Sequence, residues 1–183
     1  MTIIDHAEKY LGEIDHGWKD DDSEGGLQIV SFRDCPGESA STFMSLGLSD
    51  HTLDISETKK VRQELLFSVY SSVLPALIVS FLLSLCESIL SRHKAVLRGE
   101  VIPLSNDMVN KIGFDAVYCS IPVFFEDDFS VYDESSPSTV MVWMLPIYKS
   151  EVDYITTRGW ESFEELLEEK DPDLCALDRA PVI

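Results

Sequence analysis

The stretch LLFSVYSSVLPALIVSFLLSLC, residues 65–86, has no charged side chain and is long enough to cross a bilayer. It also contains five serines and Pro75, and its periodicity changes midway. Leu65, Phe67 and Val69 alternate with their neighbours as in a strand, whereas the pattern after Pro75 is helical. A strand and a helix of these lengths cannot span a membrane as one element. We therefore predict a strand, a tight turn and the central helix of a soluble domain.

The predicted helix has a narrow polar stripe, and apolar side chains fill the rest of its surface. The stripe consists of Ser80, Ser84, Glu87 and Ser91. A helix that is polar along only a narrow stripe is usually buried in a core. Pro75 suits the first turn, because a proline there loses no backbone hydrogen bond.

The remaining segments predict an α+β fold in which a single mixed β-sheet is flanked by helices. Helices are expected at residues 3–14, from residue 149 and at 160–173, and strands at 27–34, 43–50, 98–104, 115–125 and 138–148. The strand at 138–148 is apolar on both faces, which favours a central position in the sheet. Pro122 indicates an edge position or a bulge. The length of 183 residues suits one domain over residues 1–183, which includes an N-terminal helix and an acidic loop within residues 1–25.

The charge balance is strongly acidic, with 14 Lys and Arg against 33 Asp and Glu and a net charge of −19. Binding to nucleic acid relies on basic side chains that release counterions, so this composition argues against nucleic acid and against anionic lipid. It favours rapid encounter with a basic protein partner. The four cysteines form no CxxC pair, and the N-terminus lacks the pattern of a signal peptide. We therefore expect free thiols and a cytoplasmic location.

No motif in the sequence predicts catalysis, a metal site or a cofactor site. There is no HExxH, no GxSxG and no glycine-rich phosphate loop. The acidic clusters at 20–24 and 126–128 have consecutive carboxylates, whereas calcium loops space their ligands at alternate positions, so we interpret them as solvated loops. A hydrolase that uses Glu64 and Glu100 with a divalent metal is an alternative hypothesis.

The three tryptophans have different expected roles. Trp143 lies in an apolar strand and is expected in the core, and Trp160 is expected to seal the last helix against the sheet. Trp18 falls in a polar loop predicted at residues 17–26. An exposed Trp among acidic residues is a candidate binding anchor. The alternative is that Trp18 covers the edge of the core.

Several segments resemble the bacterial suppressor-of-fused domain family. VWMLPIYKSEVDYITTRGWESFEELLEEKDPDLCALDR (142–179) resembles the end of that domain, where a strand ending in Leu-Pro-Ile-Tyr precedes a Ser-Glu helix, a Gly-Trp junction and an Asp-x-x-Arg-like element. FMSLGLSD, QELLFSVY followed by PALIVSFLLSLCESIL, and LRGEVIPL resemble further parts in the family's order. Together these segments cover most of residues 26–179.

The resemblance implies a suppressor-of-fused-like fold and a protein-binding module that is not an enzyme. Eukaryotic relatives are similar to a two-lobed clamp that holds a short peptide of a transcription factor as an added strand. They use the acidic residue after the glycine in the strand that matches RGEVIPL, a position that is Glu100 here, with Val101 and Ile102 beside it as edge backbone. This chain is too short to contain the second lobe.

Bacterial single-domain members resemble immunity proteins, which neutralise toxins delivered by neighbouring cells, many of them nucleases. Our leading hypothesis is an immunity protein that binds a basic toxin domain, and a peptide-binding adaptor is the alternative. No metal, cofactor, nucleic acid or membrane is expected to bind. The expected partner contacts are Trp18, Asp20, Asp21, Asp22, Glu100, Val101, Ile102, Asp127 and Asp128.

Overall fold

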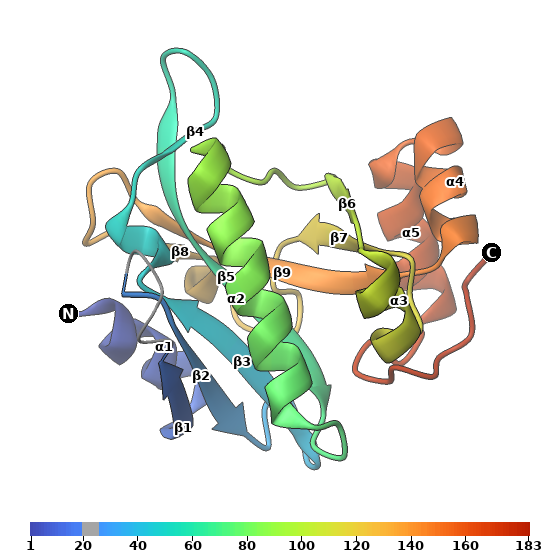
Figure 1. The fold of residues 1–183 in the computed structure, drawn as a ribbon, viewed down its shortest axis with the longest axis horizontal. Helices are drawn as coiled ribbons and strands as arrows, with labels where there is room; N and C mark the ends of the chain where they lie inside the picture. The colour runs from blue at the N-terminus through green and yellow to red at the C-terminus, as the bar shows by residue number, and fades with distance from the viewer. Residues whose placement is uncertain (20–25) are drawn as a thin grey trace.

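The computed structural model describes residues 1–19 and 26–183, which form one mixed β-sheet with helices on both faces (Figure 1). The strand order is β1-β2-β3-β5-β9-β7-β6, and β4 and β8 pair with β5 and β9. The pair β5–β9 is parallel, and the other pairs along this order are antiparallel in the described residues. The strands are β1 (Ile14–Lys19), β2 (Gln28–Arg33), β3 (Ala40–Leu46), β4 (Leu53–Asp54), β5 (Lys60–Tyr70), β6 (Val101–Pro103), β7 (Ala116–Ser120), β8 (Val131–Tyr132) and β9 (Thr139–Ile147).

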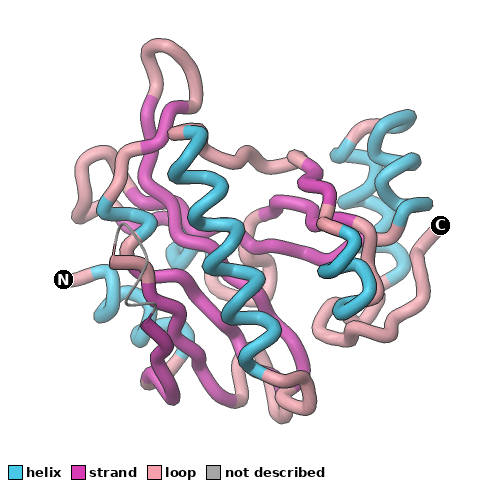
Figure 2. Tube along the Cα trace, in the orientation of Figure 1, coloured by secondary structure: helices cyan, strands magenta, loops and turns pink. Residues whose placement is uncertain are grey.

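The apolar stretch at 65–86 contains a strand and a helix, as the sequence predicts. Strand β5 ends at Tyr70, and helix α2 (Pro75–Arg92) begins at the proline that marks the change of period. The strand begins at Lys60, five residues before the apolar alternation that starts at Leu65, so β5 also contains Glu64. Figure 2 shows α2 lying over one face of the sheet.

Helix α2 is long and apolar enough to cross a bilayer by length and composition, but its packing is that of a helix on a sheet. Only 39% of its residues are buried. The helix therefore contributes its apolar face to the core, as predicted, but its exposed face is wider than the narrow polar stripe indicates. Ser80, Ser84, Glu87 and Ser91 are all exposed, and Ala76 and Ser88 widen this exposed face. Most of these side chains are Ala or Ser, which expose little apolar surface. A face made of them can therefore lie in solvent although it contains few charged residues.

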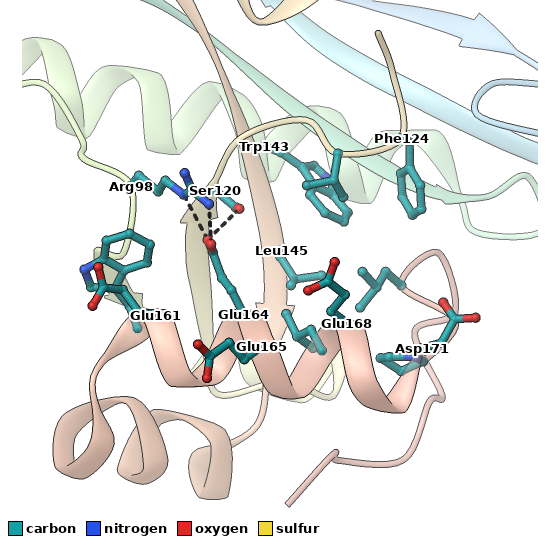
Figure 3. A pocket seen from close by; sticks show the side chains of 15 residues that line it. Arg98, Ser120, Phe124, Trp143, Leu145, Glu161, Glu164, Glu165, Glu168 and Asp171 are labelled. Carbon is teal, nitrogen blue, oxygen red and sulfur yellow. Dashed lines mark hydrogen bonds and ion pairs between the residues drawn. The ribbon is translucent and has the colours of Figure 1, made fainter. Parts of the chain in front are cut away.

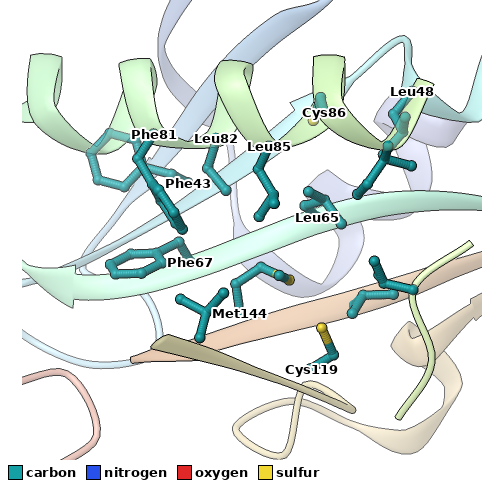
Figure 4. Packing of buried hydrophobic residues seen from close by; sticks show 14 of the residues in the cluster. Phe43, Leu48, Leu65, Phe67, Phe81, Leu82, Leu85, Cys86, Cys119 and Met144 are labelled. Carbon is teal, nitrogen blue, oxygen red and sulfur yellow. The ribbon is translucent and has the colours of Figure 1, made fainter. Parts of the chain in front are cut away.

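The sheet separates two hydrophobic cores, and the alternation of β5 supplies both. Leu65 and Phe67 face α2, whereas Leu66 belongs to the core on the opposite face. The Phe67 and Phe81 rings meet edge to face at 5.6 Å, a favourable aromatic geometry (Figure 4). Helix α3 (Asn106–Ile112) joins the first core, and α1 (Ile3–Leu11), α4 (Lys149–Arg158) and α5 (Trp160–Lys170) cover the second.

Several boundaries differ from the predictions for local reasons. Helix α1 ends at Leu11, because Gly12 has a positive φ of 90° that stops the helix. Strand β1 occupies part of the predicted loop at 17–26. Strand β3 begins three residues early, at Ala40. Strand β7 ends at Ser120, so Pro122 follows the strand and forms neither a bulge nor an edge within it.

The C-terminal part follows the predictions closely. Strand β9 lies between β5 and β7, in the interior of the sheet, and Trp143 within it is 3% exposed. Gly159 separates α4 from α5, and α5 ends before Pro172. The four cysteines are free and buried.

A buried ion pair fastens the C-terminal tail to α4 and β9. Arg179 donates to both carboxylate oxygens of Glu151, at 2.7 and 2.8 Å, and to the Pro146 carbonyl at 2.9 Å. The Glu151 carboxylate also accepts backbone N–H groups at the start of α4 and from the tail at Val182. Because both charges are almost fully removed from water, each depends on the other for its compensation.

Candidate partner-binding site

The predicted contacts near Glu100 lie at one edge of the sheet. Strand β6 pairs with β7, and no further strand lies on its outer side among the described residues. Val101 and Ile102 are half-buried there. The Glu100 carboxylate accepts the N–H of Leu97 at 3.0 Å and so closes the turn before β6.

Trp18 lies at the opposite edge of the sheet, in β1, and not in an exposed loop. Its ring lies 5.8 Å from that of Phe43, and it packs against the core below α2. Trp18 therefore covers the edge of the core and is half-buried, so it does not lie in an exposed loop. Its role as a partner contact stays a prediction. The sequence DHGWK lacks the alternation that would reveal a strand.

The acidic contacts predicted from the sequence do not form one described surface with Trp18 and Glu100. Asp127 and Asp128 are exposed in the short helix η2 (Asp127–Ser130), which leads into β8 and contacts α1. The predicted contacts Asp20, Asp21 and Asp22 lie outside the described residues.

The two carboxylates of the hydrolase hypothesis, Glu64 and Glu100, are not adjacent. Strands β9 and β7 separate β5, which carries Glu64, from β6, which follows Glu100. In residues 1–19 and 26–183, no three His, Cys, Asp or Glu side chains are grouped as ligands for a metal ion. This arrangement therefore gives that hypothesis no support.

A groove of about 890 Å³ lies between α5, the end of β7 and the middle of β9, and we call it the α5 groove (Figure 3). The loop after β7 and the segment after α5 complete it. Its lining residues are Arg98, Ser120, Val123, Phe124, Trp143, Leu145, Trp160, Glu161, Glu164, Glu165, Leu167, Glu168, Asp171, Pro172 and Leu174.

A hydrogen-bond network around Glu164 closes one end of the α5 groove. The Arg98 guanidinium donates to both carboxylate oxygens, and the hydroxyls of Tyr118 (2.8 Å) and Ser120 (3.1 Å) donate to Oε1. Burial acts to raise the pKa of Glu164, but these hydrogen bonds and the Arg98 charge outweigh it and lower the pKa overall. Glu164 is thus held in its ionised form, and both of its carboxylate oxygens accept hydrogen bonds.

Gly99 allows Trp160 to pack at the same end of the groove. It has a φ of 89°, and a Cβ atom at this position would lie 2.5 Å from the Trp160 ring. The Arg98 guanidinium lies 5.1 Å from the centroid of that ring, within the range of a cation–π contact. Three consecutive residues therefore have three roles. Arg98 places its cation against the Trp160 ring, Gly99 lets the backbone approach that ring, and Glu100 closes the turn before β6.

Sequence reasoning missed the α5 groove, although α5 contains one signal. Glu161, Glu165 and Glu168 recur at four- and three-residue spacing, which places them along one side of a helix. The loop residues Val123 and Phe124 were assigned to a strand, but they are 57% and 39% exposed.

Comparison with known proteins agrees with this architecture. The family described as Suppressor of fused protein (SUFU) matches residues 23–180. The immunity protein YqcF of Bacillus subtilis is 23% identical over 167 residues, which cover 90% of this chain and 85% of that protein.

Solved structures share the fold at low sequence identity. A putative suppressor of fused homologue from Neisseria gonorrhoeae superposes with a TM-score of 0.80 at 16% identity, covering 99% of this chain and 94% of that one. Drosophila Suppressor of Fused gives a TM-score of 0.67 at 13% identity, and the match covers 88% of this chain but 44% of that chain. A chain of the Sufu–Fu complex gives a TM-score of 0.75 at 13% identity, and the match covers 98% of this chain and 90% of that chain. On the family match over residues 23–180, this chain belongs to the suppressor of fused family.

Proposed function

We propose that this protein is a cytoplasmic immunity protein that binds and blocks a basic toxin domain, without catalysing a reaction. The observation that carries this proposal is the similarity to the immunity protein YqcF across 90% of the chain. The family match and the strongly acidic composition support it.

The charge of the chain suggests what kind of toxin it meets. A nuclease needs a basic surface to hold phosphate groups. A protein with a net charge of −19 is attracted to such a surface over long range and competes there with nucleic acid. Apolar contacts would then supply most of the affinity, and charge would supply speed and selectivity.

Glu164 is poorly suited to act as a general base. A general base needs a carboxylate that is free to accept a proton from a substrate. Arg98, Tyr118 and Ser120 already occupy the oxygens of Glu164, and its lowered pKa makes it a poor proton acceptor.

Co-expression with the product of the adjacent upstream gene tests the proposal. That product is expected to arrest growth when expressed alone, and co-expression of this chain should restore growth and yield a co-purified complex. A harmless gene product, or a toxic one that neither associates with the chain nor loses its toxicity, would refute the proposal.

The edge strand β6, which has no further strand on its outer side among the described residues, favours a second candidate, a peptide-binding adaptor. An extended peptide can add to such an edge through backbone hydrogen bonds. Glu100→Arg would remove the carboxylate that closes the turn before β6 and reverse the charge beside it. Partner binding should then be lost, whereas Glu57→Arg, at an exposed position in another loop, should have no effect. Equal binding by both variants would exclude this candidate.

A further inference from the structure

We propose that the α5 groove is the docking site for a basic segment of a partner protein that carries an apolar anchor residue. The assignment of that partner as a toxin rests on the proposed function, whereas the chemistry of the groove does not. The groove combines an apolar floor, an acidic rim and a buried donor that lacks a partner.

The apolar part of the groove is open to an incoming side chain. Val123 and Phe124 remain 57% and 39% exposed on the loop that forms one wall. The Phe124 ring lies 4.9 Å from that of Trp143, which belongs to the floor together with Leu145 (Figure 3). Exposed aromatic surface next to a preformed hollow is typical of positions that anchor a partner.

The rim of the groove is acidic. Glu161, Glu165, Glu168 and Asp171 line it, and none of them forms an ion pair among the described residues. Arg98 is the one basic residue in the lining, and Glu164 already neutralises it. The groove therefore has an excess of negative charge next to its apolar floor, which suits Lys or Arg side chains flanking an apolar anchor.

The indole of Trp143 supplies an independent sign of an absent ligand group. Its Nε1 donor is buried and has no hydrogen-bond partner among the described residues, although the side chain lines the groove. Buried donors are nearly always paired in folded proteins, because leaving one unpaired is unfavourable. A backbone carbonyl of a docked segment would provide the acceptor.

A second hollow, beside Trp18, lacks this combination. Its wall contains an ion pair between Arg33 and Asp15 at 3.1 Å, so its charges are largely balanced. It also has no described buried donor without a partner. A basic apolar segment is thus expected to prefer the α5 groove.

Fluorescence anisotropy with labelled peptides tests the proposal on the intact chain. The probe KKLFKK has an apolar anchor between lysines, KKSSKK lacks the anchor and EELFEE reverses the charge. We expect KKLFKK to bind at least about tenfold more tightly than either control peptide, which corresponds to about 1.4 kcal/mol. Equal binding of KKLFKK and KKSSKK would overturn the proposal, because it would show attraction by net charge alone.

Charge-matched variants locate the binding surface. Glu165→Lys/Glu168→Lys should weaken KKLFKK binding about tenfold more than Glu57→Lys/Glu169→Lys, which has the same net charge at exposed positions outside the groove. Equal losses in the two double variants would overturn the proposal.

An apolar pair of variants provides a second test of location. Phe124→Ser should also weaken binding, whereas Leu74→Ser, at a position that is 76% exposed at the start of α2, should leave it unchanged. Equal effects of these two substitutions would count against the groove.

The peptide assay separates failure of the groove from failure of the proposed function. If the chain neutralises its partner toxin but the groove variants bind the peptide normally, the docking proposal is wrong and the function stands. If groove-dependent binding is observed but the neighbouring gene product is harmless, the docking proposal stands and the immunity function is wrong.

Discussion

Glu64 is a fully buried carboxyl group in the middle of a sheet, and its environment determines how the protein responds to pH. Its carboxylate accepts hydrogen bonds from the Ser45 hydroxyl and from the backbone N–H groups of Gly47 (3.1 Å) and Ser49 (3.0 Å). Burial outweighs these bonds and raises the pKa of Glu64 to about 7. These bonds also tie β5 to the turn that follows β3.

The raised pKa predicts that the free energy of unfolding falls as pH rises. Glu64 binds its proton more tightly in the folded state, so its contribution is present below the unfolded pKa of 4.5 and is lost as pH rises through the folded pKa of about 7. The full change is about 3 kcal/mol. Glu64→Gln should remove this part of the pH dependence, measured by urea unfolding between about pH 5 and pH 8. Identical pH profiles for the two proteins would contradict this explanation.

Gly99 allows a second prediction at the residue scale, with Gly12 as its control. Both glycines have a φ near 90°, but a Cβ would meet Trp160 at Gly99 and no atom within 4 Å at Gly12. Gly99→Ala should therefore reduce the free energy of unfolding by about 2 kcal/mol more than Gly12→Ala, because overpacking adds to backbone strain. Equal losses in urea unfolding would show that the Trp160 contact is unimportant.

At the scale of elements, the Arg179–Glu151 pair joins the C-terminal tail to α4 and β9. Arg179→Met would leave Glu151 buried without its counter-charge, and we expect a loss of about 3–5 kcal/mol in the free energy of unfolding. Arg33→Met removes an exposed partner of Asp15 and should cost less than about 1 kcal/mol. A loss below about 1 kcal/mol for Arg179→Met in urea unfolding would contradict the assigned role of the pair.

The elements differ in how well their sequences predict them. Strand β9 and helix α2 are long and apolar, and they lie where the sequence places them because β9 is buried on both faces and α2 packs its apolar face into a core. Strand β1 was missed because pairing with β2 stabilises a segment that has no strand periodicity of its own.

The candidate site was harder to predict than the fold. The family resemblance predicts that the strand after Glu100 lies at an edge of the sheet, and β6 lies at such an edge. The α5 groove joins residues near 98, 120–124, 143–145 and 160–174, and their proximity exists only in the folded chain. Periodicity reveals the acidic side of α5, but it cannot show that this side adjoins Trp143 and Phe124.

At the scale of the whole molecule, the acidic composition and the fold have separate roles. The net charge of −19 acts over long range and is screened by salt, whereas the apolar floor of the α5 groove acts only on contact. We therefore expect ionic strength to change mainly the rate of association with a basic partner, and groove substitutions to change mainly the rate of dissociation.

The most direct test of the proposed function is stopped-flow measurement of binding between the purified chain and the product of the adjacent upstream gene, over a series of salt concentrations. We predict a complex whose association rate falls steeply as salt increases, and loss of that product's toxic activity when the complex forms. An absence of binding, or an association rate that does not depend on salt, would contradict the proposed function.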